Sequence, residues 1–209
     1  MSVQDPDTSR LETFADGVMA IAITLLILEI DVPHVDEGHS LTTALADQWP
    51  SYAAYSVSFI TIGIMWVNHH HMFTLIRVSN HMFLVLNVVF LMTIAALPWP
   101  TALLAEYIRD ADERTVATLV YGGTMVAIAI MFNVVWRYAA GGHRLLVPEA
   151  DAAAVETITR SYILGPVSYT VATLLAFVDA WISLALFAAL AGYYLLPVSG
   201  PRAERIAAR

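Results

Sequence analysis

Residues 10–32 read RLETFADGVMAIAITLLILEIDV, and this stretch decides the class of fold. Only Thr24 interrupts its apolar run from Val18 to Leu28, and the charged residues lie toward the two ends. A helix needs about 20 mostly apolar residues to cross the hydrocarbon core of a bilayer. We therefore predict a transmembrane helix over residues 11–32.

Five further stretches have the same apolar character. They cover residues 49–71, 81–104, 115–137, 157–178 and 180–197. Only the region of Asp179 separates the last two, which predicts a tight helical hairpin. The series contains no internal repeat and no second domain. The sequence thus predicts an all-α integral membrane protein, with six transmembrane helices in a single domain over residues 1–209.

The composition agrees with a bilayer as the surrounding solvent. The chain is 58% hydrophobic and 13% charged, whereas soluble domains carry about 25% charged residues. Its net charge of −8 leaves no basic stripe for phosphates, which excludes a nucleic-acid partner. The absence of cysteine excludes disulfides and thiolate chemistry. The acidic N-terminal residues lack the basic region of a signal peptide, so we expect the first helix to be retained.

The distribution of arginine predicts the orientation of the chain. If the N-terminus lies inside, only Arg109 and Arg114 fall on the outer side. The inner side then holds Arg10, Arg77, Arg137, Arg144, Arg160, Arg202, Arg205 and Arg209. Arginine in short loops is enriched on the cytoplasmic side. We therefore expect a multi-pass protein of the cell membrane with both termini in the cytoplasm.

Asp16 is an ionisable residue inside the first predicted helix. An ionised side chain at the centre of a membrane helix costs about 2.5–3.5 kcal/mol on insertion scales, and less near an end. Two interpretations remain open at this point. Asp16 either stays in the headgroup region, or it joins a buried polar network with Arg10 and groups on the next helices.

One face of the same helix carries a repeating set of residues beyond Asp16. Its members are Gly17, Ile21, Thr24, Leu25 and Leu28. Residues three or four apart share one helical face. Apolar residues at this spacing ordinarily pack against a neighbouring helix, but a ring of them around a symmetry axis forms a hydrophobic constriction. Periodicity alone leaves both interpretations open.

Three adjacent histidines, His69 to His71, end the second predicted helix. Consecutive positions on a helix point about 100° apart, whereas chelating pairs are spaced four residues apart. We therefore expect no metal site, and predict that one or two imidazoles hydrogen-bond within the bundle, with His81 and Asn87 as available partners. Asn87 needs a partner if it is buried in hydrocarbon.

The sequence predicts no enzyme and no catalytic residue. It contains no Gly-x-Ser-x-Gly motif, no phosphate-binding loop and no paired carboxylates at catalytic spacing. A metal-dependent membrane enzyme built on His69 to His71 is disfavoured by the spacing of those residues.

Several motifs resemble those of a known family. Arg10-x-x-x-Phe14-Ala15-Asp16 resembles the Arg-x-x-x-Phe-Ser-Asp signature in the first helix of the transmembrane protein 175 family, the lysosomal-type potassium channels. The further matches are Trp66-x-x-His69, Leu86-Asn87, Met92-Thr93 and Leu97-Pro98. The resemblance covers the first three predicted helices, and the last three agree only in apolar character and topology. Ala15 stands where the motif has serine, so this chain lacks one hydroxyl of the network.

The resemblance implies a role for each matched residue. The first helix would line a pore, with a constriction at Ile21, Leu25 and Leu28 and with Thr24 near the selective position. The signature residues would hold this helix against its neighbours, namely Arg10, Phe14, Asp16, Trp66, His69 and Asn87. Animal members carry two six-helix repeats and form dimers. A chain with one repeat would need four copies around the pore.

We therefore expect a passive, potassium-permeable cation channel. We expect it to be a homotetramer that conducts monovalent cations and needs no cofactor. The sequence has no Thr-Val-Gly-Tyr-Gly filter. Selection would arise at an apolar neck, and it would be modest. The alternative is a proton- or ion-coupled transporter that uses Asp16 and the histidines. No inverted repeat or pair of broken helices supports this alternative.

Overall fold

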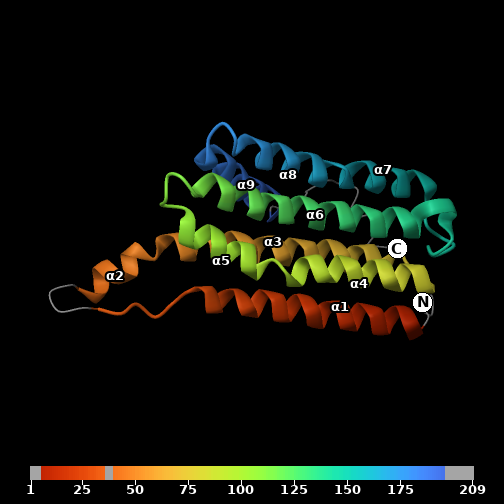
Figure 1. Cartoon of the computed structure of the whole chain (residues 1–209). Helices are drawn as coiled ribbons and strands as arrows, with labels where there is room; N and C mark the ends of the chain where they lie inside the picture. Colours follow the sequence, from red (N-terminus) through yellow and green to blue (C-terminus); the bar gives the residue numbers. More distant parts are fainter. Residues whose placement is uncertain (1–5, 36–39, 196–209) are drawn as a thin grey trace.

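The computed structural model describes residues 6–35 and 40–195 of the chain. It is a bundle of helices that lie side by side, and successive long helices run in opposite directions (Figure 1). The helices are α1 Pro6–Leu25, α2 Leu41–Asp47, α3 Trp49–Thr74, α4 His81–Ala95, α5 Pro98–Tyr107, α6 Arg114–Ala140, α7 Ala152–Tyr162, α8 Leu164–Leu175 and α9 Ala180–Leu195. Two short 3-10 turns follow α1 and α6, namely η1 Leu26–Glu29 and η2 Gly141–His143.

Four helical stretches of the described chain are long and apolar enough to cross a membrane. They are Thr8–Glu29, Trp49–Thr74, His81–Tyr107 and Arg114–His143. Each begins within a few residues of one of the first four predicted helices. The all-α class is therefore confirmed, and the described chain contains four candidate membrane helices.

The third of these stretches is bent where α4 gives way to α5. Pro98 stands in the first turn of α5, and Pro100 follows it. Proline has no N–H to donate, so the helical ladder is interrupted here. The Thr101 hydroxyl donates to the Leu97 carbonyl oxygen at 2.9 Å and satisfies one acceptor at the bend. The bend leaves Trp99 exposed on the outside of the bundle.

The fifth predicted helix is divided in two, and the sixth is described only in part. The segment over residues 157–178 forms two helices, α7 and α8, which meet at Ile163. The polar side chains of α7 include Glu156 and Arg160, which pair at 2.8 Å in an exposed position. Helix α9 is described as far as Leu195, and the predicted end at Pro197 lies outside the described residues, as do Arg202, Arg205 and Arg209. The count of six membrane spans stays a prediction.

Helix α6 runs through the centre of the bundle and packs against α4, α5 and α8. Its buried side chains include Tyr121, Phe132 and Trp136. Helix α6 approaches α8 closely at Gly122, where an added Cβ would lie 2.5 Å from Thr173 Oγ1. Glycine is required at this point because the two helices leave no room for a methyl group.

A cluster of aromatic and basic side chains joins α9 to the rest of the bundle at one end. The indole rings of Trp49 and Trp181 stack with their centroids 6.0 Å apart. The guanidinium groups of Arg109 and Arg114 lie over these rings, at 5.8 and 5.1 Å from the centroids. Asp179 Oδ1 accepts the N–H groups of Trp181 and Ile182 and so caps α9, which completes the predicted hairpin with α8.

Two connections pair with each other at the opposite end of the bundle. The Arg77 N–H donates to the Leu145 carbonyl oxygen, and the Val147 N–H donates to the Leu75 carbonyl oxygen, both at 2.9 Å. Asn80 Oδ1 accepts the N–H of Phe83 at 2.9 Å and caps the start of α4. These bonds fix where α4 begins relative to the end of α6.

We expect Gly122→Ala to lower the melting temperature of the purified protein in detergent. The new methyl group would collide with Thr173, whose hydroxyl cannot turn away without losing its 2.7 Å bond to the Tyr169 carbonyl oxygen. Overpacking of this kind costs about 1–3 kcal/mol.

Gly123→Ala is the matched control, because nothing lies within 4 Å of a Cβ at Gly123. This variant should be as stable as the wild type or more stable, since alanine favours a helix over glycine by up to about 1 kcal/mol. Equal melting temperatures for the two variants would contradict the close approach of α6 and α8.

Candidate functional site

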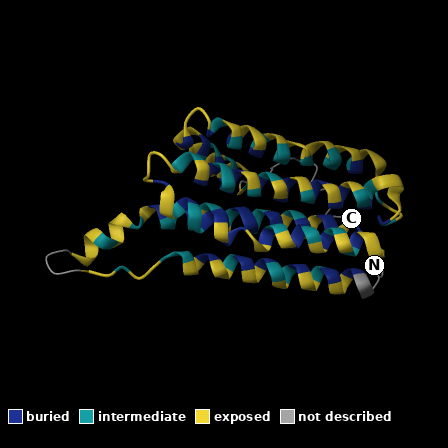
Figure 2. Cartoon of the chain, in the orientation of Figure 1, coloured by how far each residue is buried: buried dark blue, intermediate teal, exposed yellow. Residues whose placement is uncertain are grey.

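Helix α1 lies on the outside of the bundle and has two different faces. The residues buried against the neighbouring helices recur every three or four positions: Thr8, Leu11, Ala15, Met19, Ala22 and Leu26. Figure 2 shows this face in dark blue toward the bundle and the opposite face in yellow. The chain therefore covers only one side of this helix.

The exposed face of α1 and η1 holds all five residues that the sequence analysis assigned to a pore. The fractional exposure of Ile21 is 61% and that of Leu28 is 69%. Leu25, Gly17 and Thr24 are exposed as well. The Thr24 hydroxyl donates to the Ile21 carbonyl oxygen at 2.9 Å, which leaves its oxygen lone pairs free toward the outside. Within one chain, this stripe therefore does not pack against a helix of the described residues.

Two side chains of α1 pair with two side chains of α3 near the start of α1. Trp66 Nε1 donates a hydrogen bond of 2.9 Å to Asp16 Oδ1. One turn away on both helices, His70 Nδ1 lies 3.1 Å from Glu12 Oε1. The Trp66 and His70 rings stack with centroids 6.2 Å apart and planes inclined by 19°. We call these four residues the α1–α3 latch.

A second polar pair, buried between α3 and α4, lies beside the latch. His69 Nε2 lies 3.4 Å from Asn87 Oδ1, and Asn87 Nδ2 donates to the Phe83 carbonyl oxygen at 2.8 Å. Because Asn87 Oδ1 can only accept, the imidazole donates from Nε2. Its Nδ1 is then an acceptor, and it is buried without a partner in the described structure. The rings of Phe73 and Phe90 both stack on the imidazole, with centroid distances of 4.4 and 5.8 Å.

The structure thus brings together four of the six network residues expected from the sequence: Asp16, Trp66, His69 and Asn87. The side chains of Arg10 and Phe14 are exposed. Among the described residues, no ion pair joins Arg10 to Asp16, so the part assigned to Arg10 stays a prediction.

A metal-binding role of the histidines finds no support in the geometry. Where the structure describes the chain, no group of three His, Cys, Asp or Glu side chains is placed to hold a metal ion. His69 is buried, whereas His70 and His71 are exposed, and the ring centroids of His70 and His71 lie 6.1 Å apart. The adjacent positions diverge as their helical spacing requires.

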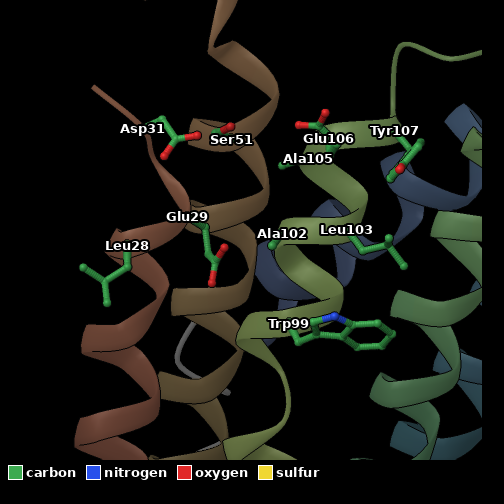
Figure 3. Close-up of a pocket in the computed structure, with 10 residues that line it drawn as sticks. All are labelled: Leu28, Glu29, Asp31, Ser51, Trp99, Ala102, Leu103, Ala105, Glu106 and Tyr107. Atoms are coloured by element: carbon green, nitrogen blue, oxygen red, sulfur yellow. The ribbon is translucent and has the colours of Figure 1, made fainter. Parts of the chain in front are cut away.

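A groove adjoins the far end of the exposed face of α1. It holds about 290 Å³ between η1, α3 and α5, and it continues into a second hollow of about 570 Å³ along the bend between α4 and α5. Figure 3 shows the carboxylates of Glu29, Asp31 and Glu106 above the indole of Trp99 in this groove. Leu28 and Glu29 line both hollows, so the groove opens directly beside the stripe that contains Ile21 and Leu28.

Sequence reasoning missed a buried hydroxyl cluster that joins three helices. Ser58 Oγ lies 2.9 Å from Thr101 Oγ1 and 3.2 Å from the Tyr121 hydroxyl oxygen. These residues come from α3, α5 and α6, and no spacing in the sequence links them. The Glu12–His70 pair was missed for the same reason.

Comparison with known proteins identifies relatives over most of the chain. The family model described as endosomal/lysosomal potassium channel TMEM175 matches residues 10–98. A potassium channel of Chamaesiphon minutus is 46% identical over 92% of this chain and 96% of its own length. A potassium channel of Streptomyces collinus is 47% identical over 90% of this chain and 91% of its own length.

The comparison extends to a solved structure and to animal proteins. The crystal structure of a lysosomal potassium-selective channel TMEM175 homologue from Chamaesiphon minutus superimposes with a TM-score of 0.84 and 42% identity, over 94% of this chain and all of that one. The human endosomal/lysosomal proton channel TMEM175 is 36% identical over 116 residues, which are 50% of this chain and 23% of the human protein.

We expect Asn87→Leu to destabilise the bundle clearly. The substitution removes the acceptor of His69 Nε2 and leaves a buried imidazole with two unpartnered nitrogens, at a cost of about 1–3 kcal/mol. The melting temperature in detergent measures the effect, and Asn68→Leu is the control because the Asn68 amide is only half buried and bonds back to its own helix at 3.0 Å.

Replacing both polar partners provides a second check. The double variant His69→Phe and Asn87→Leu should recover part of the lost stability, since no polar group then remains unpaired. A double variant less stable than the sum of the two single changes would contradict the pairing.

Proposed function

The chain belongs to the TMEM175 family of ion channels, which are not enzymes, and from this premise we propose that it is a potassium-permeable channel with a pore lined by α1. The single observation that carries the proposal is the exposed stripe of α1. It combines one hydroxyl with three large apolar side chains on a helix whose other face is fully packed. The relatives from Chamaesiphon and Streptomyces, named as potassium channels, match nearly the whole chain.

A ring of chains is required if α1 is the pore helix. One chain presents one such stripe, and a pore needs the stripe on every side, so identical copies must surround an axis. We propose a homotetramer, as the single six-helix repeat implies. The stripe would then face the axis at Ile21, Leu25 and Leu28, and α9 and the α7–α8 pair would complete six spans in each chain.

An apolar neck accounts for selection without a carbonyl filter. A ring of Ile21 side chains offers no oxygen to replace the hydration shell of an ion, so a passing ion must keep or shed water at a cost. Na⁺ holds its water more strongly than K⁺, so the neck favours K⁺ modestly. No bound cofactor takes part, and the ligands are the permeant monovalent cations themselves.

The acidic groove supplies an outer vestibule in this proposal. Glu29, Asp31 and Glu106 line the hollow beside Leu28. Carboxylates at a pore mouth raise the local concentration of cations. With Arg10 and Arg77 at the opposite end, this placement fits a chain with both termini in the cytoplasm of a cell-membrane protein.

A proton pathway is the second candidate function, because the animal relatives are named proton channels. Asp16 and His70 are partly exposed, and Asp16 directly precedes Gly17, where the exposed stripe of α1 begins. A reversal potential that follows the pH gradient rather than the K⁺ gradient would favour proton conduction. Slow, saturating transport without measurable current would favour a coupled transporter.

Ile21→Asn tests the pore. Four amides in place of four apolar side chains should admit water and hydrated Na⁺. We expect a larger conductance, a reversal potential shifted toward zero in opposed K⁺ and Na⁺ gradients, and a melting temperature near that of the wild type. Planar bilayers with the purified protein provide the currents. Polar substitutions of Leu25 or Leu28 should act in the same direction, more weakly if those rings are wider.

Ile130→Asn is the matched control, because Ile130 is a similarly exposed isoleucine on α6, with 46% of its surface accessible. This variant should keep the selectivity of the wild type. If Ile21 packs against a neighbouring helix instead, its substitution by Asn buries an unpartnered amide at about 1–3 kcal/mol. An unstable Ile21 variant with wild-type selectivity would then count against the pore.

A further inference from the structure

We propose that Arg77, Arg137 and Arg144 form a binding surface for the phosphate headgroup of an anionic phospholipid, at the end of the bundle where α1 begins. All three arginines are exposed, and each lies within a few residues of the end of a membrane-spanning helix. We call these three residues the arginine surface. The inference concerns a lipid partner, and it rests on the membrane-spanning fold rather than on the proposed pore.

Two of the arginines stand on connections that are bonded to each other. Arg77 lies on the α3–α4 connection, and its N–H donates to the Leu145 carbonyl oxygen at 2.9 Å. Arg144 directly precedes Leu145 on the α6–α7 connection. Figure 1 shows that α6 ends at the same end of the bundle at which α4 begins. The backbone pairing therefore brings Arg77 and Arg144 together from distant parts of the sequence.

Arg137 reaches the same place from the last turn of α6. The residue that follows it, Tyr138, donates its hydroxyl to Asn80 Oδ1 at 3.2 Å. Asn80 lies on the α3–α4 connection, three residues after Arg77. This bond between side chains ties the end of α6 to the connection that carries Arg77.

None of the three guanidinium groups forms an ion pair within the described part of the chain. The ion pairs found there involve His70, Arg109 and Arg160. Arg144 Nε donates to the Gly141 carbonyl oxygen at 3.2 Å, which leaves its two Nη groups for another acceptor. The planar guanidinium matches the oxygens of a phosphate in a bidentate geometry. A phosphate can therefore supply the acceptors that the chain does not.

The charges around the arginine surface leave it positive. The two connections and the last turn of α6 hold three arginines and two acids, Glu149 and Asp151. Asp151 Oδ1 accepts the Ala153 N–H and so caps α7. Glu149 is separated from Arg144 by four residues, of which Leu145 and Leu146 are buried. The arginines therefore present a positive charge to the headgroup region, which attracts an anionic lipid.

The face of α6 that leads to Arg137 is exposed and apolar. Ile130, Val134 and Arg137 stand four and three residues apart, so they share one side of the helix. The fractional exposure is 46% for Ile130 and 37% for Val134. An acyl chain can lie along these two side chains while its headgroup meets Arg137 at the end of the helix. This arrangement favours a phospholipid over a free phosphate ion, which would use the arginines alone.

A bound headgroup would hold three parts of the chain together, namely the α3–α4 connection, the end of α6 and the start of the α6–α7 connection. The α3–α4 connection in turn contacts α1, because the Thr8 hydroxyl donates to the Arg77 carbonyl oxygen at 3.4 Å. A ligand that binds the folded protein and not the unfolded chain raises the melting temperature. We therefore expect anionic lipid to stabilise the whole bundle.

The first arm of the test measures thermal unfolding of the full chain in detergent supplemented with lipid. Phosphatidylcholine and phosphatidylglycerol with the same acyl chains differ in net charge. We expect phosphatidylglycerol to raise the melting temperature by roughly 2–4 °C more than phosphatidylcholine does. Added salt should shrink this difference, because it screens the charges. Equal shifts with the two lipids overturn the proposal.

Substitutions then locate the effect on the chain. Arg77→Gln, Arg137→Gln and Arg144→Gln should each lose part of the difference between the two lipids, and the triple variant should lose nearly all of it. Arg160→Gln is the matched control, because Arg160 is exposed on α7 but already pairs with Glu156. This variant should keep the full difference.

The single variants decide the matter if the triple variant does not fold. Three single variants that keep the full difference between the lipids, or a control that loses as much as they do, contradict a site at the arginine surface. Arg137→Lys keeps the charge but not the planar fork, so it should retain more of the difference than Arg137→Gln.

The second arm distinguishes the lipid from a free anion. Inorganic phosphate, added in place of lipid at equal ionic strength, should leave the melting temperature unchanged. A phosphate shift that the arginine substitutions remove would identify a site for a free anion and overturn the lipid. Native mass spectrometry should find phosphatidylglycerol retained by the wild type and by Arg160→Gln, and largely lost from Arg137→Gln. Equal retention by all three contradicts the surface.

Neither arm depends on ion conduction. A chain that carries no K⁺ current but prefers phosphatidylglycerol through these arginines would refute the proposed function and leave the lipid surface standing. A chain that conducts K⁺ and shows no preference between the lipids would refute the lipid surface alone.

Discussion

The hydrogen bond from Trp66 Nε1 to Asp16 Oδ1 sets the rotation of α1 about its own axis. An ionised carboxylate inside a membrane helix must find water or a donor, so Asp16 turns toward α3. The small residues Ala15 and Ala22 then face the bundle and allow close packing. The same rotation forces Ile21 and Leu28 outward. The polar contact and the packed face together decide which side of α1 the described chain leaves exposed.

The other helices of the bundle hold α1 in place, because α1 packs against α3 and α4, and these pack against α5 and α6. Tyr121 and Trp136 of α6 fill the centre, and the Ser58 cluster joins α3 to α5 and α6 through buried hydroxyls. Buried polar groups that are fully paired specify one arrangement of helices, because any slip leaves them unsatisfied. The bend at Pro98 turns α5 beside η1 and forms the acidic groove where the exposed stripe of α1 ends.

Much of the fold and part of the site could be predicted from the sequence. The length and apolar character of residues 11–32 and of the next three stretches are local properties, and they predicted the long helices closely. The three- and four-residue spacing predicted that Gly17, Ile21, Thr24, Leu25 and Leu28 share one face of α1, but it did not predict that this face is exposed. The break between α7 and α8 at Ile163 was missed, because apolar character alone does not report how a helix is divided. The Glu12–His70 pair depends on the relative height of two helices, which no local pattern encodes.

The absence of cysteine in this chain permits a direct test of the central claim that α1 lines the pore. A single thiol can be placed with Ile21→Cys and exposed to a small, membrane-impermeant, thiol-reactive cation while K⁺ current is recorded in a planar bilayer. If four copies of residue 21 face the ion pathway, modification blocks the current rapidly, and an Ile130→Cys channel is unaffected. An Ile21→Cys channel that conducts K⁺ with unchanged current after the same treatment would contradict a pore lined by α1.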